Sequence, residues 1–253
     1  MAAKTTSAGK YLYAVVQASG DRDYGEIGID GARVYLISDE HVAAVVSDFT
    51  AGKIRPERRH IAAHQAVLKR VLADESLLPI SFGIIAEGSK EIRRILTLNR
   101  KPFVKQIQRV FGKVEMGLRV SWDVPNIFEY FVNTHAELRV ARDQLLGGNG
   151  SPSREDQVEV GRLFDRLLQY EREELTQKVE ACLKGCCVEI KRNPPRNEKD
   201  VMNLACLVTR QSGEKDFEAA ICVAAQGFDN NFSFDFNGPW APHNFVDVEL
   251  VLE

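Results

Sequence analysis

The sequence has few of the residues that mark several specialised classes of protein. It contains only three Met, two Trp and five Cys among 253 residues. The five Cys are an odd number crowded into the last third of the chain, which is not the layout of a disulfide framework. No stretch approaches the roughly 18 apolar residues that a membrane span needs, and residues 1–10 lack the apolar centre of a secretory signal. The sequence therefore predicts a cytoplasmic protein with no lipid-membrane partner.

The chain also lacks an excess of positive charge. It carries 33 Lys and Arg against 36 Asp and Glu, which gives a net charge of −3. A dedicated nucleic-acid-binding domain is usually strongly basic, so this charge argues against a nucleic-acid partner. Hydrophobic residues make up 44% and charged residues 27% of the chain. These are the proportions of an ordinary globular protein with a core, and the length predicts one large or two small domains.

The first half of the chain predicts strands followed by helices. Short segments rich in Val and Tyr predict strands, and Pro56 suits the first turn of a helix. Pro102 is expected to separate two later helices. The predicted strands cover 11–17, 33–38, 41–47 and 77–85, and the apolar face of the helix after Pro56 is predicted at Ile61, His64, Leu68, Val71 and Leu72.

The second half begins a new run of elements after Gly112. Its predicted order is strand, helix, helix, strand, strand, helix, strand, and Ser153 with Asp156 resembles a capping box at the start of a long helix over 154–183. This order is that of a ferredoxin-like fold with one extra helix inserted. We therefore predict an α+β protein with an N-terminal α+β domain at 1–112 and a C-terminal modified ferredoxin-like domain at 113–253. A single fused sheet is the alternative.

Residues 83–90 (GIIAEGSK) follow an apolar strand and open a helix, which is the context of a phosphate-binding loop. That motif requires Lys and then Ser or Thr after its second Gly, whereas here Ser89 precedes Lys90. The exchange moves the Lys out of register with the phosphates. A strand-to-helix turn capped by Ser89 explains the same residues better.

His60 and His64 lie four residues apart on a predicted helix, a spacing at which two imidazoles can share a metal ion. The zinc-protease motif needs Glu directly after the first His, where this chain has Ile61. No third ligand is evident, and the cysteines near residue 186 have no partner CxxC pair. A core-facing His64 and a surface His60 explain the pair better. We assign no catalytic residue, metal or cofactor, and the alternative is an enzyme that uses the 83–90 loop or the His60 and His64 pair.

Phe232, Phe234 and Phe236 alternate with polar residues, which predicts a half-buried strand. Aromatic side chains on a ferredoxin-like sheet can stack on RNA bases, but the Gly and basic residues of that motif are absent. Core packing or a protein-binding face is the better explanation. No nucleophile elbow and no paired acid and base stand out either.

A set of further segments is unusual when taken together. They are LLPISFG (77–83), GKVEMGLRVSWD (112–123), MNLACLV (202–208) and GPWAPHNFV (238–246), preceded by the strand KYLYAVV. From about Lys10 to Val246 the chain closely resembles the gas vesicle protein GvpL/GvpF family, with these segments in the family's order and spacing. Ala241 and His243 depart from that pattern, because family members commonly carry a second Pro and an aromatic residue there. Of the two types in the family's name, GvpF is the one predicted.

This resemblance implies a minor or accessory protein of gas vesicles, whose wall is built from the small and very hydrophobic subunit GvpA. It implies support of vesicle assembly through binding of GvpA, other accessory Gvp proteins or both, without catalysis. A subunit that turns an apolar face to gas is prone to aggregate before assembly, so a partner that covers this face has a clear task. In the GPWAPHNF segment we expect an architectural loop, with Trp240 packed and Pro239 and Pro242 limiting its conformations.

Overall fold

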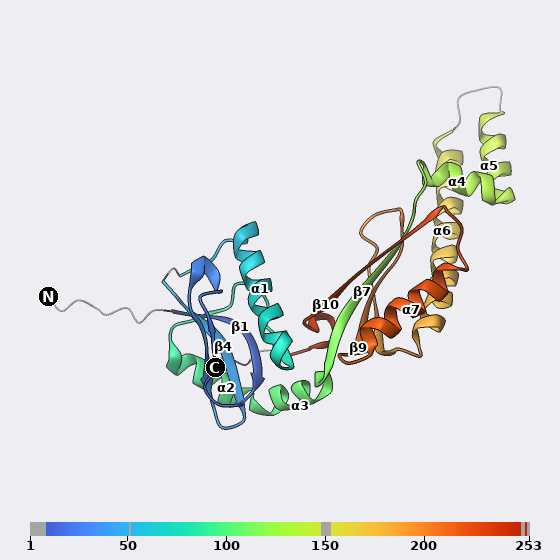
Figure 1. The fold of residues 1–253 in the computed structure, drawn as a ribbon. Coiled ribbons are helices and arrows are strands. Elements are labelled where there is room, and N and C mark those ends of the chain that lie inside the picture. Colours follow the sequence, from blue (N-terminus) through green and yellow to red (C-terminus); the bar gives the residue numbers. More distant parts are fainter. Residues whose placement is uncertain (1–8, 51, 148–152, 249–250, 252–253) are drawn as a thin grey trace. The chain divides into compact units, whose positions relative to one another are not determined.

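A computed structural model describes residues 9–50, 52–147, 153–248 and 251, and the chain divides into two compact units (Figure 1). Unit 1 comprises Met1–Glu115, Thr209–Gln211 and Pro239–Glu253. Unit 2 comprises Met116–Val208 and Ser212–Gly238. The sequence division at 112 placed the residues from Pro239 onward in the second domain, but they belong to unit 1 because Ala241 and Phe245 are buried there. That each unit folds on its own stays a prediction.

Unit 1 is built on an antiparallel sheet in the order β2-β3-β4-β1-β5, with β6 also paired to β1. The three strands predicted at 11–17, 33–38 and 41–47 are confirmed as β1, β3 and β4. Both β1 and β4 are buried on both faces, which explains why their sequences are continuous apolar runs without alternation. The bounds are β1 Gly9–Gln17, β2 Asp23–Gly25, β3 Val34–Ser38, β4 Val42–Phe49, β5 Leu77–Pro79 and β6 Ile85–Ala86.

The single strand predicted over 77–85 is wrong, because the chain turns between β5 and β6. Gly83 adopts a φ of 95°, a left-handed conformation that favours glycine. Its N–H donates to the Tyr11 hydroxyl at 3.0 Å, and the N–H of Ile80 donates to the Tyr13 carbonyl at 2.9 Å. The two short strands therefore pair with different parts of β1.

The helices of unit 1 are α1 Arg58–Asp74, α2 Ser89–Leu98 and α3 Arg100–Val110, with short 3-10 turns η1 Ile29–Gly31 and η2 His243–Phe245. Helix α1 contacts β1 and η1, whereas α2 contacts β3 and β4. The break between α2 and α3 falls at Asn99, which puts Pro102 in the first turn of α3, where proline is tolerated.

The buried face of α1 differs from the predicted one at its N-terminal turn. Ile61 is 41% exposed, whereas His60 is buried. His60 is buried because its ring makes polar contacts with η1 and with the loop before α1, and these contacts orient the first turn of the helix. The buried side chains of α1 are His60, His64, Val67, Leu68, Val71 and Leu72.

Unit 2 contains most of a four-stranded sheet in the order β10-β7-β9-β8. The predicted helix over 154–183 is confirmed as α6, and the Ser153 hydroxyl accepts the N–H of Asp156 at 3.1 Å. The helix expected after Pro125 breaks into α4 and α5 at His135, whose backbone is extended. The bounds are β7 Lys113–Trp122, α4 Ile127–Thr134, α5 Ala136–Leu146, α6 Arg154–Leu183, β8 Cys187–Asn193, β9 Asp200–Thr209, α7 Gly213–Ala225 and β10 Phe232–Trp240.

An aromatic cluster joins the sheet of unit 2 to its helices. The rings of Trp122 and Phe131 lie 5.4 Å apart, and Phe131 also contacts Phe164 on α6 at 5.4 Å. The Arg172 guanidinium lies 5.9 Å from the Trp122 ring and donates to the Asp200 carbonyl at 2.9 Å. Large buried rings in edge-to-face contact contribute strongly to a core, so this cluster fixes α4 and α6 on β7.

Candidate functional site

The predicted loop at residues 83–90 does not form an anion cradle in the structure. Helix α2 begins at Ser89 with Gly88 as its N-cap, and no side chain caps the helix, so the predicted capping by Ser89 is wrong. The Glu87 N–H donates to the Glu91 carboxylate from the first turn of α2. A carboxylate therefore occupies the place beside the helix N-terminus that favours negative charge. Its charge would repel a bound phosphate.

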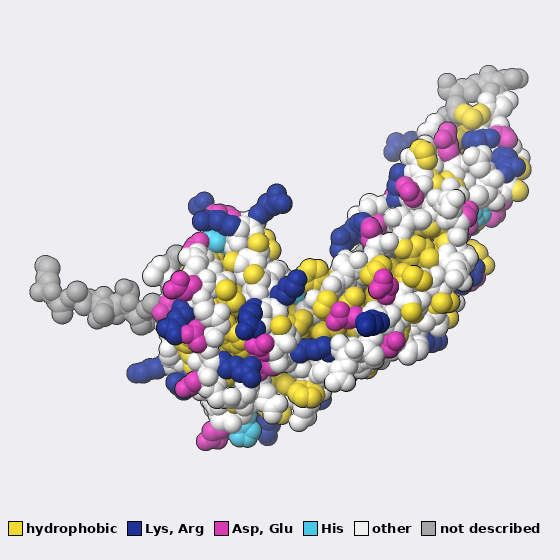
Figure 2. All heavy atoms as spheres, in the orientation of Figure 1, with side chains coloured by type: hydrophobic (Ala, Val, Ile, Leu, Met, Phe, Trp, Pro, Cys, Tyr) yellow, Lys and Arg dark blue, Asp and Glu magenta, His cyan; other side chains and the backbone are white. Residues whose placement is uncertain are grey.

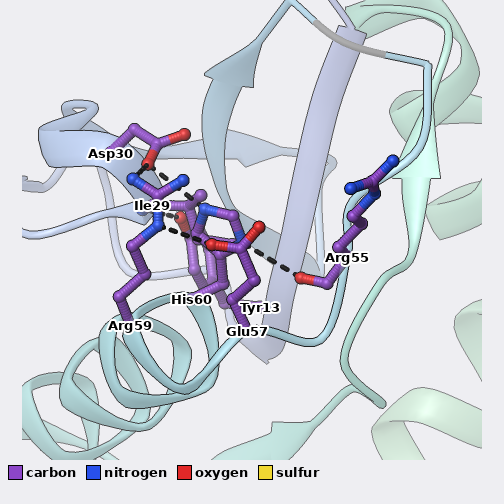
Figure 3. Close-up of polar contacts among 7 residues, drawn as sticks. All are labelled: Tyr13, Ile29, Asp30, Arg55, Glu57, Arg59 and His60. Atoms are coloured by element: carbon purple, nitrogen blue, oxygen red, sulfur yellow. Dashed lines mark hydrogen bonds and ion pairs between the residues drawn. The ribbon is translucent and has the colours of Figure 1, made fainter.

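His60 lies within a polar cluster between α1 and η1 (Figure 3). Its Nδ1 is 3.0 Å from the Arg55 carbonyl oxygen, and its Nε2 is 3.2 Å from an Asp30 carboxylate oxygen. The side chain is only 7% exposed, so the predicted surface position is wrong. Both ring nitrogens are engaged in contacts within the protein.

Asp30 is held toward α1 by an unusual backbone conformation. Its φ of 54° is the one positive value among the described residues other than glycine. Asp tolerates this left-handed region better than most residues. Sequence reasoning did not single out Asp30, although Asp followed by Gly is a turn signal.

His64 lies one turn further along α1, inside unit 1. It is 2% exposed, and its Nδ1 is 3.0 Å from the Tyr11 hydroxyl. That hydroxyl accepts the Gly83 N–H, so its own hydrogen is free to point at Nδ1. Burial, followed by the neighbouring His243, lowers the pKa of His64 to about 4. His64 is thus a neutral core residue, whereas a shared metal would require its ring to face His60.

The described residues contain no group of three or more His, Cys, Asp or Glu side chains placed to hold a metal ion. Cys186 and Cys187 are neighbours, with their sulfur atoms 3.8 Å apart, and burial raises the pKa of the Cys186 thiol to about 12. A thiol with so high a pKa stays protonated near neutral pH, which makes it a poor nucleophile and a poor metal ligand.

The GPWAPHNF segment is anchored to unit 1 through residues other than the predicted one. Trp240 is 41% exposed, so its predicted packing is wrong, whereas Phe245 is fully buried. The N–H and side-chain amide of Asn244 donate to the two carboxylate oxygens of buried Glu115 at 2.8 and 2.6 Å. Trp240 stays outside because it ends β10, and η2 three residues later turns Phe245 inward.

The β10 strand forms one edge of the sheet that it shares with β7, β9 and β8. An edge strand presents unpaired backbone groups to which another chain can add a strand. Asp235 on this strand binds Arg119 of β7 at 2.7 Å. Gly117 of β7 lets the Asn237 side chain lie close to the strand, because a Cβ at this position would lie 2.8 Å from the Asn237 side-chain oxygen and would displace it.

The predicted alternation of Phe residues forms an aromatic row on β10. Phe232 and Phe234 are half-buried, and the ring of Phe228 lies 5.0 Å from each of them. Phe236 continues the row and is 43% exposed. Figure 2 shows hydrophobic side chains gathered on the face of this unit where α7 lies. We call Phe228, Phe232, Phe234 and Phe236 the aromatic edge.

None of the helices in the described ranges combines the length and the apolar character that a membrane crossing requires. The fold and the aromatic edge define the class of the chain, an α+β protein of two units in which one antiparallel sheet is bordered by a partly exposed aromatic row. Residues 9–247 match the family described as "Gas vesicle synthesis protein GvpL/GvpF". The chain belongs to this family, and the resemblance found in the sequence is confirmed.

Similar proteins cover nearly the whole chain. It is 24% identical over 248 residues to "Gas vesicle protein F" of Nostoc sp., which covers 96% of this chain and 99% of that protein. It is 23% identical over 269 residues to "Gas vesicle protein L" of a Streptomyces species, which covers 94% and 93%. The crystal structure of GvpF from Anabaena sp. has a TM-score of 0.84 at 22% identity over 96% of this chain and 100% of that chain. This last likeness shows that the fold is shared.

Proposed function

We propose that this protein supports gas vesicle assembly by binding the hydrophobic shell subunit GvpA, another accessory Gvp protein or both, without catalysis. The observation that carries the proposal is the aromatic edge, in a chain of this family. A partly exposed apolar row on an edge strand offers both burial and backbone hydrogen bonds to a partner that is itself apolar. The protein would act at the gas vesicle and stay in the cytoplasm before assembly.

The enzyme alternative has less support. The loop at 83–90 has the Glu91 carboxylate where a phosphate would lie, and the rings of His60 and His64 make contacts with different parts of unit 1. A nucleotide-dependent rise in melting temperature, or stoichiometric bound zinc, would favour an enzyme.

We further propose that the chain is of the F type and that unit 2 is a modified ferredoxin-like domain. The F relative covers slightly more of both chains than the L relative does, which supports the first point. The order of strands in the sheet supports the ferredoxin-like assignment. If β7, β8, β9 and β10 are counted as strands one to four, their order across the sheet is four, one, three, two. The antiparallel pairing of β8 with β9 is consistent with that fold. In this interpretation α4 and α5 together replace the one inserted helix.

Replacing Phe236 with Asp should weaken binding to the Gvp partner at least about tenfold, because a carboxylate would lose its water in an apolar contact. The melting temperature should change little, since the ring is 43% exposed in the free protein. The measurement is co-purification of the tagged protein with each Gvp protein in turn, followed by calorimetry with the one that binds. Binding should show a negative heat-capacity change and little dependence on salt.

Val188→Asp is the matched control, because Val188 is exposed on β8, the opposite edge of the same sheet. It should bind as the wild type does. Equal losses in the two variants would remove the aromatic edge from the proposal, and failure to bind any Gvp protein would remove the proposal itself.

A further inference from the structure

A hollow of about 500 Å³ opens in unit 1 beside the polar cluster of His60. It lies between η1, the end of β4 and the loop before α1. Ile29 is buried in its wall, and Phe49 and Ile54 are half-buried. The hollow therefore has an apolar floor, although charged side chains surround it.

Each carboxylate around this hollow has a cationic neighbour. Asp30 lies 3.5 Å from the Arg59 guanidinium and also contacts His60, and Glu57 binds Arg59 at 2.8 Å. Asp48 forms an ion pair with Lys10, and its other contact is the Tyr35 hydroxyl at 2.9 Å. These contacts reduce the negative charge around the hollow, with Arg59 shared between Asp30 and Glu57.

The two cations of the hollow make no close polar side-chain contact in the described part of the chain, although Arg59 and, more weakly, the charge of Arg55 lower the pKa of Glu57. The side chains of Lys53 and Arg55 are exposed, and neither forms a hydrogen bond or ion pair with any other residue in the described ranges. Figure 3 shows the Arg55 guanidinium pointing away from the His60 cluster, to which Arg55 contributes only its carbonyl oxygen. Two exposed cationic side chains that form no hydrogen bond or ion pair within the described ranges thus belong to the lining of the hollow.

We propose that this hollow binds an acidic peptide segment of a partner protein, with a carboxylate between Lys53 and Arg55 and an adjacent apolar side chain against Phe49 and Ile54. The charge complementarity and the apolar floor both favour this occupant. Arg binds a carboxylate through two parallel N–H donors, which gives such a contact direction as well as strength. Inorganic phosphate fits less well, because it has no apolar part to place against Phe49 and Ile54. The proposal does not depend on the role of the aromatic edge.

A blocked peptide of alternating Leu and Glu tests the proposal by isothermal titration calorimetry at low salt, with the same peptide carrying Gln for Glu as its comparison. The Glu peptide should bind the full-length protein and the Gln peptide should bind at least about tenfold more weakly. Raising the salt to physiological strength or above should weaken the Glu peptide several-fold, since exposed charges are screened.

The variant Lys53→Gln with Arg55→Gln should weaken the Glu peptide at least about tenfold. The control is Arg58→Gln with Lys69→Gln, which removes the same net charge from exposed positions on α1 outside the hollow. The control variant should bind the Glu peptide with an affinity within about twofold of that of the wild type. Both double variants should melt as the wild type does, because all four side chains are exposed.

Three results would overturn the proposal. One is no binding of the Glu peptide to the wild type, and another is equal binding to the two double variants. The third is displacement of the bound Glu peptide by inorganic phosphate at a lower concentration than unlabelled Glu peptide requires. That result would make the hollow a site for small anions. None of these results bears on binding of a Gvp protein to the aromatic edge, so the two proposals fail separately.

Discussion

Replacing Phe245 with Ala should lower the free energy of unfolding of unit 1 by about 3–5 kcal/mol, the usual range for a buried Phe. Phe245 is fully buried, so the substitution removes a large apolar side chain and leaves a cavity. Trp240→Ala, five residues earlier, should lower it by less than Phe245→Ala does, because 41% of the Trp240 surface is already exposed. Urea denaturation followed by far-ultraviolet circular dichroism measures both.

This comparison decides what holds the C-terminal segment on unit 1. A larger loss from Trp240→Ala than from Phe245→Ala would show that the exposed indole is the anchor after all. A Trp240→Ala variant that keeps its stability but loses a Gvp partner would instead make Trp240 part of an interface. Asn244→Ala offers a second measure of the anchor, since it leaves one oxygen of buried Glu115 without the Asn244 side-chain donor.

The sequence predicted those elements whose patterns are set by local chemistry. The long helix α6 was found with its capping Ser153, because the apolar period and the cap are both visible within the segment itself. The strands β1 and β4 were found because they are continuous apolar runs. Family membership rested on several segments in a fixed order, which single motifs such as the 83–90 loop do not provide.

The errors concern features that depend on residues far apart in the chain. His60 was placed on the surface, because its contact with Asp30 joins positions 30 residues apart and requires a left-handed backbone at Asp30. Trp240 was expected inside because a large aromatic residue between two prolines resembles a core anchor. Because β10 ends at Trp240 and η2 follows at His243, Trp240 is exposed and Phe245 is buried. No local sequence pattern predicts where the strand ends and the turn begins. The hollow was missed for the same reason, since its lining comes from η1, β4 and α1 together.

Acid should destabilise unit 1 through His64. Burial lowers the pKa of His64 to about 4 in the folded protein, below its ordinary value of 6.5. As the pH falls from 6.5 toward 4, the unfolded chain takes up a proton on this ring and the folded protein does not. Stability is therefore fully present above pH 6.5 and is lost progressively down to pH 4, by up to about 3 kcal/mol from this one group.

The measurement is the free energy of unfolding from urea titrations at several pH values between 4 and 7, for the wild type and for His64→Gln. The variant should be less stable at pH 7, because it loses the contact with Tyr11. Its stability should nevertheless fall less steeply with acid, since the group that takes up the proton is gone. The remaining slope comes from carboxylates and from His243, whose pKa burial also lowers.

His41→Gln is the matched control, because His41 is exposed on the loop before β4. It removes an imidazole from the surface and leaves the buried ring of His64 in place. If His64→Gln and His41→Gln give the same slope between pH 4 and 6.5, His64 is not the acid-sensitive group. The difference between the two slopes isolates the ring that burial and the neighbouring His243 hold neutral. A clear difference would show that burial in unit 1 keeps this ring unprotonated throughout the neutral range.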